Sequence, residues 1–205
     1  GFRNADISLT IGHPMQATLN FENLLFTIHE MPLRQLPFVA LDVETTGYTP
    51  PQARITEIAL IRMEGGKVEE FSSLINPEIP IPAQIVQITG INDAMVKDQP
   101  ILGEVFSTIA RLLENAIFVS HNVPFDFAFL DQAYKDIAKR PLEIPSMCTL
   151  KLSRKYLGLR SNNLGSVATH LGVDLRQAHR AMADTKAVVG ILENFINRFE
   201  TMGIR

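Results

Sequence analysis

The spacing of apolar residues predicts three strands early in the chain. The segment 38–44 is a short run of mostly apolar residues, and two further strand patterns follow at 54–63 and 67–75. Between the last two, Gly65 and Gly66 supply the positive φ angles that a tight hairpin turn requires. We therefore expect the sheet to begin with antiparallel strands.

Helical spacing of apolar residues dominates the second half of the chain. A helix is predicted from about residue 101, and a short apolar strand follows at 117–120. The later helices are predicted at about 125–139, 149–157, 163–171 and 180–200. The segment 76–91 is rich in proline and turn residues and is expected to form a loop with a short helix. Strands followed by alternating helices and strands are typical of an α/β fold, a mixed β-sheet flanked by helices.

Residues 1–36 have a weaker pattern. Apolar residues at helical spacing predict a helix over 21–31, with Asn20 as its cap. We interpret residues 1–36 as an N-terminal appendage that packs on a main domain at 37–205. The first residue is glycine, which indicates a processed protein or an excised fragment.

Composition narrows the class of protein. The net charge of −3 lacks the large positive excess of proteins that coat nucleic acid, so a polyanion would have to be met by a local site. A single cysteine, Cys148, excludes an intrachain disulfide and suits a reducing compartment. No apolar run approaches the roughly 20 residues of a membrane span, and no signal-peptide pattern opens the chain. We expect a cytoplasmic protein with no membrane partner.

Two carboxylates stand at the end of the first strand. Because side chains alternate along an extended chain, Asp42 and Glu44 share one face, roughly 6.6 Å apart along the strand. Phe38 and Ala40 share that face, and apolar residues on both faces indicate a central strand, where unpaired charges are costly. Two interpretations are open: the acids emerge into solvent as the strand ends, or they bind cations.

Two later acids fall on the apolar faces of helices. Asp126 opens the helix at 125–139 and begins its apolar stripe, which continues through Phe129, Leu130, Ala133 and Ile137. Taken alone, Asp126 is better explained as an acid that complements the helix dipole. Asp184 lies on the apolar face of the last helix, where a surface acid would not normally fall.

Three elements thus each bring carboxylate to a position that faces the core. A shared divalent cation site explains all of them, and oxygen ligands of high charge suit Mg²⁺ or Mn²⁺. Four acids exceed what one Mg²⁺ usually takes from a protein. The pattern therefore predicts two ions about 4 Å apart, as in phosphoryl-transfer enzymes.

The acids lie in motifs whose order and spacing resemble a known family. The motifs are LDVETTG (41–47), HNVPFD (121–126) and HRAMAD (179–184), with TEIAL (56–60) and LINP (74–77) between the first two. They resemble the DnaQ-like (DEDD) exonucleases, in the histidine branch that includes the epsilon proofreading subunit of bacterial DNA polymerase III. The resemblance covers residues 37–200 and implies a ribonuclease H-like fold. It also implies the site residues: Asp42, Glu44, Asp126 and Asp184 as metal ligands and His179 as general base.

Spacing alone leaves two histidines as candidates for the base. Both His121 and His179 precede an aspartate by five residues. The resemblance assigns catalysis to His179 and gives His121, beside Asn122, the role of shaping the second motif. An imidazole with an ordinary pKa near 6.5 is suited to take a proton from water at neutral pH.

The resemblance also implies a cleft for the terminal nucleotide. Its lining would be Thr45, Thr46, Ile88, Thr89, His121, Asn122 and Phe125. Small polar residues leave room for the backbone to approach a 3′-hydroxyl, and Phe125 offers a ring to a base. Each lining residue has an alternative place in a turn or in the core. Further along, Lys151, Arg154, Lys155 and Arg160 form either a track for phosphates or an ordinary solvated helix face.

The function implied is a metal-dependent 3′→5′ exonuclease, a phosphodiesterase that hydrolyses DNA to nucleoside 5′-monophosphates. Its expected partner is the 3′ end of single-stranded or frayed nucleic acid, DNA rather than RNA. An RNA-directed exonuclease of the same superfamily and a nucleic-acid-binding module without activity are the alternatives. All five motif residues are present, which argues against the second. The chain ends at Arg205 without a long tail, so the sequence gives no support to a polymerase partner.

Overall fold

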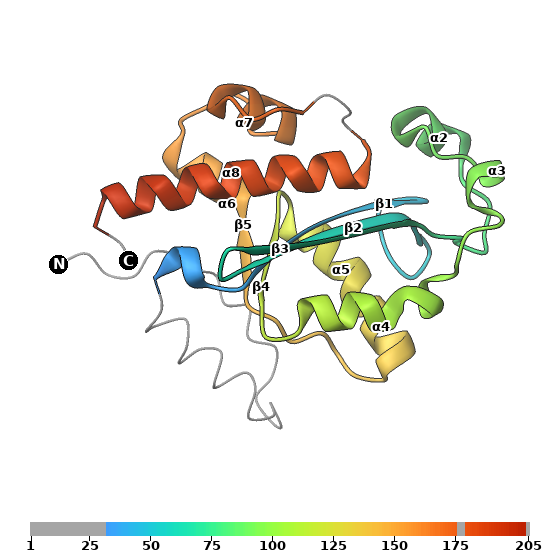
Figure 1. Cartoon of the computed structure of the whole chain (residues 1–205). Coiled ribbons are helices and arrows are strands. Elements are labelled where there is room, and N and C mark those ends of the chain that lie inside the picture. The colour runs from blue at the N-terminus through green and yellow to red at the C-terminus, as the bar shows by residue number, and fades with distance from the viewer. Residues whose placement is uncertain (1–31, 176–178, 204–205) are drawn as a thin grey trace.

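Five strands form one mixed sheet in the order β3–β2–β1–β4–β5 (Figure 1). The computed structural model describes residues 32–175 and 179–203. The strands are β1 Phe38–Thr45, β2 Ile55–Glu64, β3 Lys67–Leu74, β4 Ile117–Ser120 and β5 Ser146–Cys148. The first three pair antiparallel, whereas β4 pairs parallel with both β1 and β5. The predicted antiparallel start and the central position of the first strand are confirmed.

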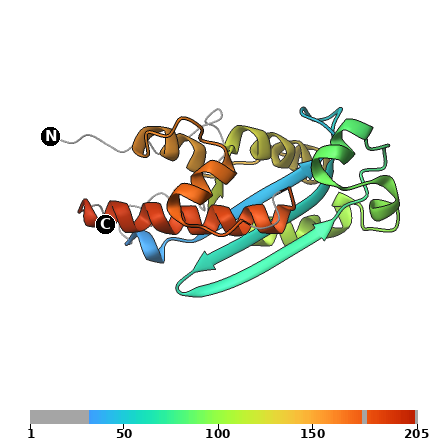
Figure 2. The ribbon, with the colours of Figure 1, turned by 90° about the horizontal axis from the view of Figure 1, so that it is seen from above.

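Helices cover both faces of the sheet (Figure 1). On one face lie α4 (Leu102–Leu113) and α5 (Val123–Ala133), and a π-helical turn, Tyr134–Ala138, continues α5. On the other face α8 (Ala181–Thr201) packs on β1 and β2, as the view from above shows (Figure 2). The helices α6 (Thr149–Tyr156) and α7 (Leu164–Leu171) pack on α8. Two short helices, α2 (Ala83–Thr89) and α3 (Asp93–Val96), lie beyond the end of β1 (Figure 1).

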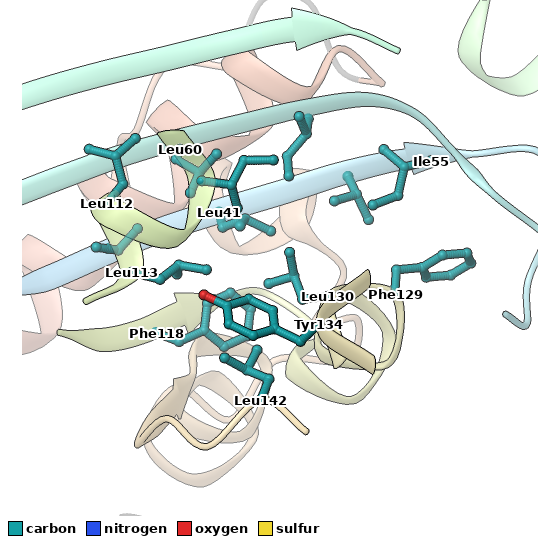
Figure 3. Close-up of a cluster of buried hydrophobic side chains, with 14 of the residues drawn as sticks. Leu41, Ile55, Leu60, Leu112, Leu113, Phe118, Phe129, Leu130, Tyr134 and Leu142 are labelled. Carbon is teal, nitrogen blue, oxygen red and sulfur yellow. The ribbon is translucent and has the colours of Figure 1, made fainter. Parts of the chain in front are cut away.

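The alternation of side chains along β1 joins two hydrophobic cores. Val39, Leu41 and Val43 belong to the core between the sheet and the helices α4 and α5 (Figure 3). Phe38 and Ala40 belong to the core beneath α8. Because both faces of β1 are covered, the acids near its end lie at the edge of a dry interior.

The elements predicted within the described residues are present, and their differences from the prediction have local causes. The helix expected at 125–139 begins at Val123, and its last turn is π-helical. That wider turn moves Ile137 out of the predicted apolar stripe: Ile137 is 38% exposed, and Tyr134 is buried instead. The strand β5 was not predicted, because three residues are too few to show an alternating pattern.

The first residues of the described part pack on the main domain. Leu36 is buried beneath α8, and Arg34 forms an ion pair with Glu200 of α8. The helix predicted at 21–31 lies outside the described residues, so the division into residues 1–36 and 37–205 stays a prediction. Among the described helices, none combines the length and apolar character needed to cross a bilayer.

Candidate active site

The end of β1 places two acids on the face that α8 covers. Asp42 and Glu44 follow Phe38 and Ala40 on this face of the strand. The antiparallel register sets Glu44 opposite Glu57 of β2. Since residues directly opposite each other share a face, three acids gather at this end of the sheet.

The fourth acid, Asp126, arrives from α5. The strand β4 pairs parallel with β1 from Phe38 to Ala40. After β4 the chain turns into α5, next to the part of β1 that extends beyond this pairing. There Asp126 Oδ1 accepts a hydrogen bond from the Val43 N–H at 3.3 Å. The buried carboxylate of Asp126 therefore lies against the peptide between Asp42 and Glu44.

The start of α8 brings the last two residues of the site. Asp184 is buried in the first turn of α8, and its Oδ2 accepts a hydrogen bond from the His179 N–H at 3.1 Å. One ring nitrogen of His179 and one carboxylate oxygen each of Glu44 and Asp184 lie within 4.8 Å of one another. The structure thus brings together the four predicted acids and His179.

Burial and mutual repulsion make these acids hard to ionise. Burial raises the pKa of Asp42 well above its ordinary value, and the charges of Asp126 and Asp184 raise it further. Burial, with the charge of Asp184 next in weight, raises the pKa of Glu44 to about 8. Burial also raises the pKa of Asp126 to about 7 and raises that of Asp184. Such a cluster favours either bound protons or bound cations.

The residues of the cluster fit a divalent cation. Asp184 Oδ1 is buried and has no hydrogen-bond partner among the described residues. A buried carboxylate oxygen without a donor is costly, and carboxylates are the ligands that Mg²⁺ and Mn²⁺ prefer. The donor set, four acids with a histidine beside them, is therefore suited to hard cations.

The two candidate histidines have different surroundings. His121 is half-buried, with Nδ1 2.9 Å from Thr149 Oγ1 and Nε2 2.8 Å from the carbonyl oxygen of Asn162. Because a carbonyl oxygen only accepts, Nε2 is the donor, and Nδ1 accepts from the hydroxyl. Burial lowers the pKa of His121. Both ring nitrogens of His121 are thus engaged in the framework, whereas His179 is exposed beside the acids.

The three threonines of the predicted lining are buried, and their hydroxyl groups form hydrogen bonds with backbone groups nearby. Thr46 Oγ1 accepts a hydrogen bond from the Arg54 N–H at 2.9 Å, which closes the loop after β1. Thr89 donates to the Ile85 carbonyl at 3.1 Å, at the end of α2. Thr45 donates to the carbonyl of Gly47. The three hydroxyls are therefore engaged with nearby backbone groups, and the place of these residues in a lining stays a prediction.

The remaining lining residues present accessible side chains. Ile88 on α2 is 47% exposed, and Asn122 before α5 is exposed. Phe125 is partly exposed and packs on Phe129, with 5.1 Å between the ring centroids. The basic residues at 151, 154, 155 and 160 are all exposed. Of these, Arg154 lies near enough to His121 for its charge to lower the pKa of that histidine, after the larger effect of burial.

Sequence reasoning missed two charged residues at this site. Glu57 of β2 and Arg180, the residue before α8, form an ion pair with 2.9 Å between Arg180 Nη2 and Glu57 Oε1. The signal in the sequence was a glutamate inside a strand that is otherwise apolar from Ile55 to Ile61 apart from Thr56. Its meaning depends on the register of β1 and β2, which the sequence does not show.

The chain is similar in sequence to an exonuclease family and to DNA polymerase III proteins. The RNase T family model, described as an exonuclease, matches residues 39–192. Over 149 residues the chain is 36% identical to the DNA polymerase III subunit epsilon of Aquifex aeolicus, covering 72% of this chain and 74% of that protein. Over 158 residues it is 36% identical to the PolC-type DNA polymerase III of Clostridium perfringens, covering 76% of this chain. The chain spans only 11% of the length of that polymerase.

Solved structures share the fold. E. coli exonuclease I in complex with a dT13 oligonucleotide aligns with a TM-score of 0.73 at 21% identity, over 82% of this chain and 42% of that chain. Exonuclease X in complex with 5′ overhanging duplex DNA aligns with a TM-score of 0.61 at 25% identity, over 81% of this chain and 93% of that chain. The ribonuclease H-like fold and the resemblance to DnaQ-like exonucleases are thereby confirmed. The family model spans most of this chain, and the match to the epsilon subunit covers most of both proteins. This chain therefore belongs to the RNase T exonuclease family.

Proposed function

We propose that this chain is a metal-dependent 3′→5′ exonuclease that hydrolyses DNA to nucleoside 5′-monophosphates. The observation that carries the proposal is the meeting of Glu44, Asp184 and His179 at one point, with ligand atoms within 4.8 Å of one another. Asp42 and Asp126 lie close enough to add their charges to the same cluster. Phosphodiester hydrolysis needs both a cation site and a base, and this cluster offers both.

The four acids are the proposed ligands of two Mg²⁺ or Mn²⁺ ions. When bound, such ions stabilise the negative charge that develops on the attacking and leaving oxygens of the phosphodiester. Asp42, Glu44, Asp126 and Asp184 come from three elements, so the folded chain sets their spacing before any cation arrives. Burial, and after it the charges of the neighbouring acids, raises the pKa values of Asp42 and Glu44, which indicates how strongly the cluster favours added positive charge.

His179 is the proposed general base. Its backbone N–H is held by Asp184, and its ring lies beside Glu44 and Asp184 on the exposed side of the site. The neutral imidazole accepts a proton from the water that attacks phosphorus. The bond from phosphorus to the 3′ oxygen of the preceding nucleotide breaks, and that oxygen takes up a proton. The products are a nucleoside 5′-monophosphate and a strand one nucleotide shorter.

DNA is the proposed substrate, and its free 3′ end the part that enters the site. The epsilon relative is named as a subunit of a DNA polymerase, and the two solved neighbours were crystallised with DNA. In this chain, the exposed Ile88 and the partly exposed Phe125 offer apolar surface to a base, and Thr45 and Thr46 follow Glu44 directly, where the proposal places the 3′-hydroxyl. The polymerase names of the relatives also support a DNA polymerase as protein partner. The single cysteine and a DNA substrate support a cytoplasmic location.

The proposal is tested with matched DNA and RNA oligonucleotides of one sequence, labelled internally and blocked at either end. We expect Mn²⁺-dependent shortening of the DNA from its free 3′ end, faster than that of the RNA, with no effect of a 5′ block. EDTA should abolish the reaction. Cleavage of a 3′-blocked strand as fast as a free one, or full activity in EDTA, would contradict the proposal. Faster cleavage of RNA would replace DNA as the substrate.

A matched pair of variants links this activity to the acid cluster. Asp42→Ala should remove hydrolysis even with excess Mn²⁺, because a ligand is lost from the centre of the cluster. Asp98→Ala removes an acid whose side chain is 82% exposed and paired with Lys97 outside the cluster, and it should keep the wild-type rate. Equal rates for the two variants would show that the cluster is not the site.

A further inference from the structure

Glu57 is a buried acid whose two oxygens are both occupied by donors from the start of α8. Arg180 donates from Nη2 to Oε1 at 2.9 Å and from Nε toward both oxygens at 3.2 Å. The backbone N–H of Ala181 donates to Oε2 at 3.0 Å. The side chain of Glu57 is only 7% exposed, against 47% for Arg180.

These donors separate Glu57 from the four acids of the cluster. Glu57 lies opposite Glu44 and is close enough for its charge to raise the pKa of Glu44. A carboxylate whose oxygens both face N–H donors is already compensated, whereas Asp184 has a buried oxygen without a partner among the described residues. Glu57 is therefore placed to hold protein groups and not a cation.

The groups that Glu57 holds lie next to His179. Asp184 belongs to α8, whose buried residues Val188 and Leu192 pack on the sheet and fix the helix there. His179 precedes that helix, and its φ of 65° lies in the left-handed region that residues other than glycine rarely adopt. Such a conformation persists only where neighbouring contacts hold it. Two sets of contacts hold it here. The His179 N–H donates a hydrogen bond to Asp184, and Glu57 accepts hydrogen bonds from Arg180 and Ala181, the next two residues.

We propose that Glu57 and Arg180 are positioning residues that fix the backbone at 179–181 and so aim the imidazole of His179 at the attacking water. The proposal rests on the function proposed above, in which His179 is the base. Glu57 does not touch the substrate in this account. Its effect on the reaction passes through His179.

The chain offers a matched control on the same helix. At the other end of α8, Arg34 and Glu200 form an ion pair at 2.9 Å, and it lies on the surface. Glu200→Gln and Glu57→Gln each remove one charge from an Arg–Glu pair that ties α8 to the rest of the fold. Of the two glutamates, Glu57 bonds the two residues that follow His179, so its replacement alone should change the chemical step.

Glu57→Gln replaces one acceptor oxygen by an NH₂ group that faces Arg180 or Ala181. A misplacement of about 1 Å can cost ~10²-fold in rate, so kcat should fall by about 10- to 100-fold. The KM for single-stranded DNA should stay within about two-fold, because substrate binding is not involved. Arg180→Gln should act in the same direction. It also serves if Glu57→Gln fails to fold, because the Arg180 side chain is half-exposed. Glu200→Gln should keep the wild-type kcat.

The decisive readout is the effect of Glu57→Gln in a His179→Ala background, measured in single-turnover assays with excess enzyme. If Glu57 acts through His179, the second substitution should cost no more than about two-fold once the base is gone. A further loss as large as in the wild type would overturn the positioning role while leaving the proposed function intact. An unchanged rate in the single variant His179→Ala would contradict both the positioning role of Glu57 and the proposed role of His179 as general base.

Discussion

Both ring nitrogens of His121 are engaged in hydrogen bonds, whereas the ring of His179 is exposed beside the acids. His179→Ala should lower turnover by ~10²–10⁴-fold, the usual worth of a general base, and should leave binding of single-stranded DNA largely intact. The acidic limb of the pH–rate profile should flatten, because no imidazole remains to become protonated. The measurement is kcat against pH, with DNA binding measured in parallel.

His121→Ala is the matched control for that measurement. It removes two hydrogen bonds of a half-buried ring, so it should destabilise the fold by about 1–3 kcal/mol and keep the acidic limb. A His179→Ala enzyme with the wild-type profile, or a His121→Ala enzyme that loses the limb, would mean that the base is assigned wrongly.

The sequence predicts single residues well where a regular pattern makes them stand out. Alternation in the first strand and helical spacing in the last helix expose Asp42 and Asp184 as acids in apolar surroundings. The resemblance was still needed to choose between the histidines, because the contacts of His121 with Thr149 and Asn162 cross from one element to others. Hydroxyl partners such as that of Thr46 depend on loop closure, which no local pattern shows.

At the scale of elements, the long regular segments were predicted, whereas the three-residue strand β5 and the π-helical turn were not. The strand β2 and the helix α8 have many buried residues at a constant period. The strand β5 has three residues, and the π-helical turn after α5 breaks the period on which the prediction of Ile137 depended. The paired acids Glu44 and Glu57 could not be foreseen, because the register of two strands is a property of their pairing.

The packing of α8 against the segment that leads toward His179 gives a prediction at this scale. A Cβ atom at Gly190 would lie 2.8 Å from Cγ1 and 3.2 Å from Cγ2 of Val173. Valine is stiff at χ1, so it cannot move aside easily. Gly190→Ala should therefore destabilise the fold by about 1–3 kcal/mol through overpacking, despite the better helix propensity of alanine. Urea unfolding measures this change.

Val173→Ala provides the control for that variant. Combined with Gly190→Ala, it removes both methyl groups that the new Cβ would meet, so part of the lost stability should return. A Gly190→Ala protein as stable as the wild type, or a double variant that is no better than the single one, would contradict the close approach of α8 and Val173.

At the scale of the whole molecule, the fold gathers like charges at the end of its central strand. The pKa of Glu44 is raised to about 8 and that of Asp126 to about 7, whereas both are near 4 in an unfolded chain. Between about pH 4 and pH 8 the folded state thus binds more protons than the unfolded state. The stabilisation from these groups is fully present below that window and is lost as pH rises through it.

Stability in EDTA and in Mn²⁺ tests this linkage. In EDTA, the free energy of unfolding of the wild type should fall more steeply from about pH 5 to pH 8 than that of Asp42→Asn, which lacks one of the acids whose pKa is raised in the folded state. Mn²⁺ should stabilise the wild type more at the higher pH, because cations bind the ionised acids. Equal slopes for the two proteins, or Mn²⁺ stabilisation that is greatest at low pH, would contradict the described cluster.

The arrangement of the whole sheet explains why the acids meet, and only part of it was readable in advance. The order of the predicted elements indicated a mixed sheet with flanking helices. The order β3–β2–β1–β4–β5 sets the start of α5 beside the end of β1 and lays α8 over the same end. Those contacts join residues more than 80 positions apart, such as Val43 and Asp126, and no local pattern encodes them.

Whether the four acids bind two cations can be seen by diffraction at the manganese absorption edge, from crystals grown with Mn²⁺ and a nucleoside 5′-monophosphate. We expect two anomalous peaks about 4 Å apart, contacted by Asp42, Glu44, Asp126 and Asp184. Glu57 should still be paired with Arg180 and should contact neither ion. The absence of any peak among the four carboxylates, or ions held by other residues instead, would contradict this expectation.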